Sequence, residues 1–271
     1  MTVLVTGATG NVGRHLVRWL VDRGHPVRAL TRTPDRADLG PGVEVVGGDL
    51  TDTATLTGAF AGVDAVHLIT FGGEGDELDN AADIVDLAVA SGARRATVLG
   101  AWGGSPMERA VRTDLLEWTL LAPGEFMSGA LEWAPDVHGE GAVRTLSDWP
   151  SAVVHEADIA AVAGVALTEG GHGDRIHVLT GPEALTPAAR AEAIGRAIGR
   201  EVAWVRLTEE QERARLRAQG FPEEYVEFGI SLATDPPETA DRVLPTVEEV
   251  TGRPARTFAD WARDNADAFR S

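Results

Sequence analysis

A glycine-rich segment near the N-terminus constrains the fold more than any other feature. The apolar residues Val3–Thr6 lead into Gly7, Gly10 and Gly13 at the start of an amphipathic stretch. In this pattern the first glycine permits a tight turn, the second lets the backbone approach a pyrophosphate, and the third lets a helix pack closely on the sheet. Free N–H groups at the helix N-terminus favour the negative phosphates. The segment therefore predicts a dinucleotide-binding strand–turn–helix unit, with Thr9, Asn11 and Val12 also at the cofactor.

The first 125 residues alternate short apolar runs with amphipathic stretches. The expected strands are Val3–Thr6, Val27–Thr31, Val43–Val46, Ala65–Ile69, Ala96–Leu99 and Trp118–Leu121. The expected helices are Asn11–Arg23, Thr53–Phe60, Leu78–Ser91 and Pro106–Glu117. Apolar strands that each precede a helix are typical of a parallel sheet covered on both faces. The predicted fold class is α/β, a doubly wound parallel Rossmann sheet with a smaller, discontinuous substrate domain.

The alternation stops after Pro123, which defines the expected domain boundaries. Residues 1–124, with about 151–181, should form the nucleotide-binding domain. The substrate-covering domain should consist of residues 125–150 and 182–271. The first of these segments is irregular and rich in Gly, Pro and Trp. The later expected elements are a strand at Ala152–His155, a helix capped by Asp158 and running to about Leu167, strands at Ile176–Leu179 and Val202–Leu207, and helices at Pro187–Ile198, Glu209–Gln219, Pro222–Leu232 and Phe258–Phe269.

Charge and composition exclude several classes of function. The chain of 271 residues has a formal net charge of −18, which disfavours nucleic acid and anionic membrane surfaces as partners. All 24 basic residues are arginine and cysteine is absent, so lysine Schiff bases, a P-loop lysine, thiolate nucleophiles and disulfides are ruled out. The seven histidines show no metal-ligand spacing, so no metal site is expected. Without a basic leader or a long apolar run, a cytoplasmic location is expected.

The end of the second expected strand indicates which nicotinamide cofactor is preferred. Sites that prefer NAD usually place an acidic residue there to bond the ribose 2′-hydroxyl. This chain has Arg32, whose guanidinium matches a 2′-phosphate in charge and geometry. The sequence therefore predicts NADP(H) as the cofactor.

Ligands of open α/β sheets bind outside the carboxyl ends of the strands. By this rule the remaining cofactor-contacting candidates are Asp49, Leu50, Ile69, Thr70, Phe71, Gly100, Ala101, Pro123 and Phe126. Aromatic residues near the same ends predict a substrate pocket formed by Trp102, Phe126, Trp133 and Trp149, although for each one taken singly a packing role is slightly favoured.

Only weak candidates exist for a catalytic side chain. Ser105 and Glu108 have capping-box spacing, so Ser105 is better explained as a helix start than as an active-site residue. His138 lies in the irregular segment expected to cover the cofactor, and Tyr225 is the single tyrosine. The catalytic residue stays unassigned.

The chain resembles the NmrA-like, NAD(P)-binding branch of the atypical short-chain dehydrogenases. The resemblance rests on VLVTGATGNVGRHLVRWLVDRGHPVRALTRTP, GDL, DAVHLIT, EWTLLAPGEFM and VVHEADIAAVAGVAL, and it covers nearly the whole chain. It implies a Rossmann fold, a nicotinamide cofactor at Gly7, Gly10 and Gly13, and Arg32 on the 2′-phosphate. The Tyr-x-x-x-Lys pair of typical short-chain dehydrogenases is absent, and Ala122 and Gly129 replace the arginine and asparagine of the family's usual segment.

These observations favour an NADPH-dependent reductase of a conjugated or aromatic acceptor, such as a quinone or a polyketide-type intermediate. An electron-poor acceptor needs no strong protein acid, because the cofactor carries the chemistry. A non-catalytic NADP(H) sensor and a redox-neutral isomerase or lyase remain as alternatives. The expected partner is a small molecule, and the oligomeric state, monomer or homodimer, stays open.

Overall fold

The structure is a computed structural model that describes residues 1–73, 75–100 and 104–270. Its chain divides into two compact units. Unit 1 contains Met1–Pro123, Glu156–Leu179 and Thr246–Arg253, and unit 2 contains Gly124–His155, Thr180–Pro245 and the C-terminal residues from Pro254. The boundaries differ from the sequence expectation by one or two residues at Gly124 and at Thr180, and by more in two further places. Residues 151–155 fall in unit 2, and 246–253 return to unit 1.

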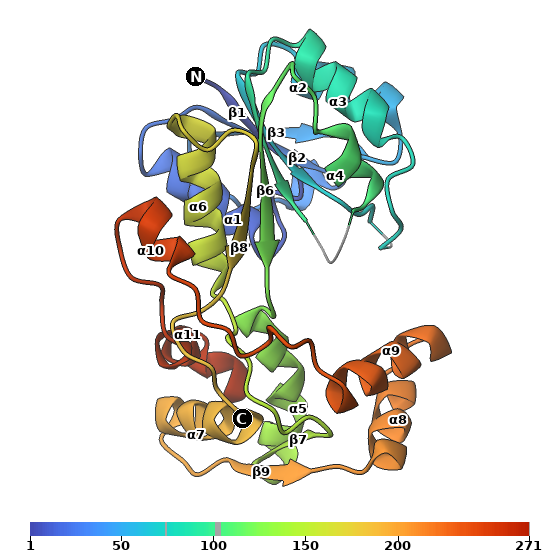
Figure 1. The fold of residues 1–271 in the computed structure, drawn as a ribbon, viewed down its shortest axis with the longest axis vertical. Coiled ribbons are helices and arrows are strands. Elements are labelled where there is room, and N and C mark those ends of the chain that lie inside the picture. Colours follow the sequence, from blue (N-terminus) through green and yellow to red (C-terminus); the bar gives the residue numbers. More distant parts are fainter. Residues whose placement is uncertain (74, 101–103, 271) are drawn as a thin grey trace. The chain divides into compact units, whose positions relative to one another are not determined.

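Unit 1 is built on a parallel seven-stranded sheet in the order β3-β2-β1-β4-β5-β6-β8 (Figure 1). The strands are β1 (Val3–Val5), β2 (Val27–Thr31), β3 (Val43–Gly47), β4 (Ala65–Ile69), β5 (Arg95–Leu99), β6 (Glu117–Pro123) and β8 (Arg175–Leu179). This is the doubly wound Rossmann order. From β1 the chain adds β2 and β3 on one side, and it then crosses to the other side of β1 to add β4 and the later strands. The predicted fold class is confirmed.

Helices cover both faces of this sheet. Helices α1 (Gly13–Val21) and α6 (Glu156–Thr168) pack against each other on one face, with α10 (Thr246–Thr251) beside α6. Helices α2 (Thr57–Phe60), α3 (Ala81–Ala90) and α4 (Pro106–Ala110) contribute to the apolar core on the other face. Short 3-10 turns η1 (Pro34–Arg36) and η2 (Thr53–Thr55) follow β2 and β3.

Unit 2 has its own core and a small parallel sheet of β7 (Ala142–Thr145) and β9 (Ala203–Arg206). Its other elements are η3 (Met127–Trp133), α5 (Ala134–Glu140), α7 (Pro187–Ile198), α8 (Glu209–Ala218), α9 (Glu223–Thr234), α11 (Phe258–Asp264) and η4 (Ala266–Phe269). The core gathers Met127, Val143, Ile194, Phe258 and Trp261, which come from three separate stretches of the chain.

Several local expectations are wrong. Residues 125–150 contain η3, α5 and β7 and are not irregular, because side chains such as Val137 and Val143 are buried against distant parts of unit 2. Residues 152–155 form no strand of a sheet; the backbone of Val154 instead bonds Glu125 and Met127. Asp158 is the third residue of α6 and lies inside its first turn, so it is not the N-cap residue that the sequence predicts.

The helix expected at Pro106–Glu117 ends at Ala110. Beyond it the N–H of Thr113 donates to Val111 O, and the Thr113 side chain accepts from Leu115 N, 3.3 Å away. Local bonds of this kind compete with helix continuation.

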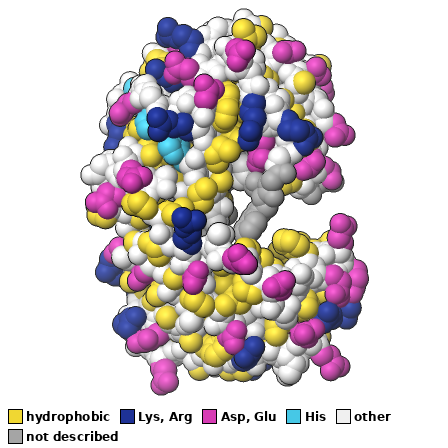
Figure 2. Space-filling view, viewed as in Figure 1, with side chains coloured by type: hydrophobic (Ala, Val, Ile, Leu, Met, Phe, Trp, Pro, Cys, Tyr) yellow, Lys and Arg dark blue, Asp and Glu magenta, His cyan; other side chains and the backbone are white. Residues whose placement is uncertain are grey.

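Charges of both signs are spread over the face of the molecule drawn in Figure 2. Among the described residues, no helix has the length and apolar character needed to cross a membrane.

Candidate functional site

The loop between β1 and α1 is shaped by backbone geometry. Thr6 ties the end of β1 to β4, since its hydroxyl donates to His67 O at 2.9 Å and accepts from Ile69 N at 3.2 Å. Gly7 then takes φ +59°, and its carbonyl accepts from Gly10 N at 2.9 Å. A Cβ built on Gly13 would lie 2.1 Å from Gly7 O, closer than any real side chain permits. The loop and the helix start therefore touch through bare backbone.

The N-terminus of α1 suits an anionic ligand. Val12 at the N-cap offers no side-chain bond to the first turn, and that turn contains no acidic residue. Helix N–H groups and the helix dipole favour phosphate at such an end. Arg14, which the sequence analysis missed, adds positive charge here, because its guanidinium donates to Gly10 O at 3.1 Å and Thr9 O at 3.2 Å. A dinucleotide pyrophosphate fits these residues.

Arg32 is exposed directly after β2. Its guanidinium lies against Gly73, since a Cβ on that glycine would be 1.7 Å from Nη1 and 2.1 Å from Cζ. Asp49 is the nearby acidic group. Hydrogen bonds from the backbone N–H and hydroxyl of Thr51 hold the pKa of Asp49 below its usual value, and the charge of Arg32 adds to the effect.

The start of α3 is tied to the segment after β3 by Asn80, a residue that the sequence analysis did not single out. Asn80 Nδ2 donates to Leu50 O and to Thr53 Oγ1, both at 2.8 Å. Thr70 is buried at the end of β4, whereas Phe71 is 38% exposed. The ends of β3 and β4 lie on the same edge of the sheet as Gly7, whose missing Cβ would sit 3.1 Å from the Ile69 side chain.

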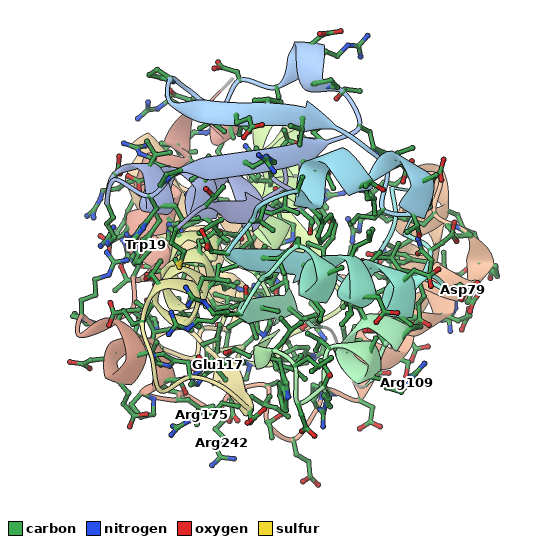
Figure 3. All side chains as sticks on the ribbon, turned by 90° about the horizontal axis from the view of Figure 1, so that it is seen from above. Trp19, Asp79, Arg109, Glu117, Arg175 and Arg242 are labelled. Atoms are coloured by element: carbon green, nitrogen blue, oxygen red, sulfur yellow. The ribbon has the colours of Figure 1, made fainter. Side chains whose placement is uncertain are left out.

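A buried carboxylate, that of Glu108, lies beside the end of β5. Glu108 is 6% exposed, its Oε2 accepts from Gly104 N at 2.7 Å, and a Cβ on Gly100 would lie 2.5 Å from its Oε1. Ser105 accepts from Glu108 N at 3.2 Å and so caps α4, as its spacing predicts. Arg109, labelled in Figure 3, donates to Gly104 O. Ala101 and Trp102 lie outside the described residues.

In unit 2 the predicted pocket residue Trp133 is only 8% exposed. The guanidinium of Arg190 lies 5.0 Å from its ring centroid and forms an ion pair of 2.6 Å with Glu125, while Arg190 itself is 4% exposed. Phe126 is half-buried and pairs with Val154, and Pro123 is the last residue of β6. Arg190 is the main residue here that sequence reasoning missed, because nothing in its surrounding helix pattern distinguishes it from a surface arginine.

The other candidates of unit 2 lie on separate elements. Trp149 donates from Nε1 to Ala233 O at 3.2 Å, and His138 is exposed in the last turn of α5. Tyr225 is 44% exposed on α9 and stacks on Phe221 with ring centroids 4.4 Å apart. Burial and the charge of Glu132 raise its pKa. Within the described residues no hydrogen bond joins His138 to Tyr225, and no group of three or more His, Asp or Glu is placed to hold a metal.

Comparisons with known proteins agree with this geometry. Residues 7–169 match a family described as NAD(P)H-binding. The chain is 39% identical to the (4-alkanoyl-5-oxo-2,5-dihydrofuran-3-yl)methyl phosphate reductase of Streptomyces griseus, over 98% of this chain and 99% of that protein. It is 35% identical to the NAD(P)H azoreductase of Xenophilus azovorans, again over 98% and 99%.

Among solved structures, the NADPH-dependent quinone oxidoreductase QOR2 of Escherichia coli, complexed with NADPH, has the same fold. The TM-score is 0.80 and the identity 24%, over 97% of this chain and 99% of that one. The resemblance inferred from the sequence is confirmed: the chain belongs to the NAD(P)H-binding family, and its fold is NmrA-like.

Proposed function

We propose that this protein is an NADPH-dependent reductase of electron-poor conjugated acceptors. The observation that carries the proposal is the N-terminus of α1 behind the Gly7–Gly13 loop, where Val12 gives no side-chain cap and the first turn has no acidic residue. The same chain contains no lysine, and its one tyrosine lies on α9 in the other unit, so no Tyr-x-x-x-Lys pair stands beside β5.

In this proposal the residues of the chain bind and orient the cofactor and the acceptor, and none of them is assigned as the proton donor. Gly7, Gly10 and Gly13 let the backbone approach the pyrophosphate, and Arg32 pairs with the 2′-phosphate. A bound nicotinamide supplies the hydride, and solvent supplies the proton. The Glu108 carboxylate accepts from Gly104 N and lies against Gly100 just after β5, where the reacting end of the cofactor is expected in a Rossmann fold.

The acceptor class follows from the site and from the relatives. Without a Tyr-x-x-x-Lys pair, a simple ketone should be a poor substrate, whereas a conjugated acceptor delocalises the charge that hydride addition creates. The two relatives above are named for a furanone phosphate and for azo compounds. We therefore infer an acceptor that is a small conjugated molecule, such as an unsaturated lactone, a quinone or an azo compound. Phe126, Trp133 and Trp149 remain its predicted contacts.

The first experiment follows NADPH oxidation with a panel of acceptors: an alkanoyl furanone phosphate, a quinone, an azo dye and a saturated ketone as the control. Turnover of one or more conjugated acceptors and none of the ketone supports the proposal. Tight NADPH binding without turnover on any acceptor would instead favour a sensor, and product formation in protein freed of nicotinamide would favour an isomerase or lyase.

The cofactor preference has its own test. Arg32→Glu should reverse the preference from NADPH to NADH, because a carboxylate repels the 2′-phosphate and accepts from a ribose hydroxyl. Equal NADPH affinity in the variant and the parent would overturn the role of Arg32.

A further inference from the structure

The position of the Arg32 side chain depends on a glycine in another loop. The guanidinium occupies the space that a side chain at position 73 would fill: an added Cβ would lie 1.7 Å from Nη1, 2.1 Å from Cζ and 2.6 Å from Nη2. Gly73 comes after β4, whereas Arg32 comes after β2. The absence of a side chain at position 73 is therefore what allows the guanidinium to lie there.

Backbone contacts are formed on either side of Gly73 in the chain. Phe71 and Glu77 pair as an antiparallel bridge, and Gly72 N donates to Asp76 O at 2.7 Å. Gly72 lies against the loop after β3, since a Cβ there would be 2.7 Å from the Thr51 methyl group. Two adjacent glycines thus bring the loop after β4 onto Thr51 and onto Arg32.

The charges around Arg32 leave it available to an anion. Among the described residues no carboxylate lies within ion-pair distance of its guanidinium, and the neighbouring Asp49 already accepts from the N–H and hydroxyl of Thr51. A guanidinium free of a carboxylate partner that lies beside Gly73 is suited to a doubly charged phosphate.

We propose that Gly73 is a specificity-determining position for the 2′-phosphate of NADPH, acting by leaving room for Arg32. This inference rests on the proposed NADPH preference. The backbone of Gly73 does not have a positive φ, so alanine is conformationally allowed. The colliding atoms are the far end of a flexible side chain, so Gly73→Ala displaces the guanidinium and leaves the fold intact.

The test measures the affinity of the whole protein for NADPH and for NADH by titration. Gly73→Ala should weaken NADPH binding about tenfold, the value of one charge-assisted hydrogen bond, and leave NADH binding unchanged. The matched control is Gly58→Ala in α2, where an added Cβ meets nothing within 4 Å. An unchanged NADPH affinity in Gly73→Ala, or an equal loss for both nucleotides, would overturn the inference.

A double variant separates this inference from the proposed cofactor preference. In an Arg32→Ala background, Gly73→Ala should cause no further loss of NADPH affinity, because the group that it displaces is gone. If Arg32→Ala alone leaves the preference for NADPH intact, the proposed role of Arg32 fails. If Arg32→Ala weakens NADPH binding and Gly73→Ala does not, only the role of Gly73 fails.

Discussion

The cofactor loop of unit 1 and the Trp133 region of unit 2 are built in opposite ways. The loop consists of consecutive residues, Gly7 to Gly13, whose backbone atoms touch because side chains are missing. The Trp133 region consists of Glu125, Trp133 and Arg190. It is formed by contacts between large side chains that are far apart in the sequence. Backbone geometry tolerates almost no substitution, whereas side-chain contacts can be rebuilt. The two regions should therefore respond differently to substitution.

The largest effect is expected for Gly13→Val, which tests whether the loop depends on backbone contact. A side chain there meets the Gly7 carbonyl at 2.1 Å, and backbone cannot move aside as a side chain can. We expect NADPH affinity to fall by about a thousandfold or more, because the helix start moves away from the pyrophosphate. Titration with NADPH measures it, with Gly58→Ala as the control. A variant that folds and still binds within tenfold of the parent would contradict the role assigned to the loop.

His67 on β4 is a fully buried titratable side chain in the interior of unit 1. Burial lowers its pKa to about 4 from 6.5, and Nδ1 lies 2.8 Å from Thr97 Oγ1. The folded state therefore resists a proton that the unfolded chain accepts, so stability falls as the pH drops from 6.5 towards 4.

The loss attributable to His67 should be about 3 kcal/mol across this window. Urea unfolding at a series of pH values measures it, and His67→Gln should show a correspondingly flatter dependence. Parallel curves for the variant and the parent would show that His67 is not the group responsible.

A smaller effect is expected in unit 2, at Arg190. Arg190→Ala removes the group that packs on Trp133, but the Glu125 carboxylate left behind is 39% exposed and can be hydrated. We expect a loss of about 2 kcal/mol in the free energy of unfolding. Arg196→Ala on the same helix, where both partners of the ion pair are exposed, should cost about 0.5 kcal/mol or less. Equal losses in the two variants would contradict a structural role for Arg190.

The smallest effect concerns Tyr225. Tyr225→Phe keeps the ring that stacks on Phe221 and removes only the hydroxyl, so kcat for a conjugated acceptor should change by about twofold or less. Steady-state NADPH oxidation measures it. A fall of about a hundredfold or more, the usual loss when a general acid is removed, would make Tyr225 the proton donor.

The same contrast explains how much could be predicted from the sequence. The sheet and the glycine loop were predictable because local periodicity and spacing dictate them, and Ser105 caps α4 as expected. The sequence did not predict the roles of Asn80, Arg190 and Gly73, because each contacts residues that only the fold brings near. The spacing of Glu108 from Ser105 predicts a capping residue, but its contacts with Gly100 and Gly104 could not be predicted from that spacing.

The packing of α1 on α6 has a consequence for how the protein is made. Trp19 of α1, labelled in Figure 3, fits against Gly164 of α6 so closely that an added Cβ would lie 2.3 Å from its ring, and Arg23 covers the ring at 3.9 Å. During synthesis α1 leaves the ribosome long before α6, with residues 124–155 of unit 2 made in between. Contacts so distant in sequence form late. The helix that follows the dinucleotide loop therefore gains its packing partner α6 only after residues 124–155 of unit 2 have been made.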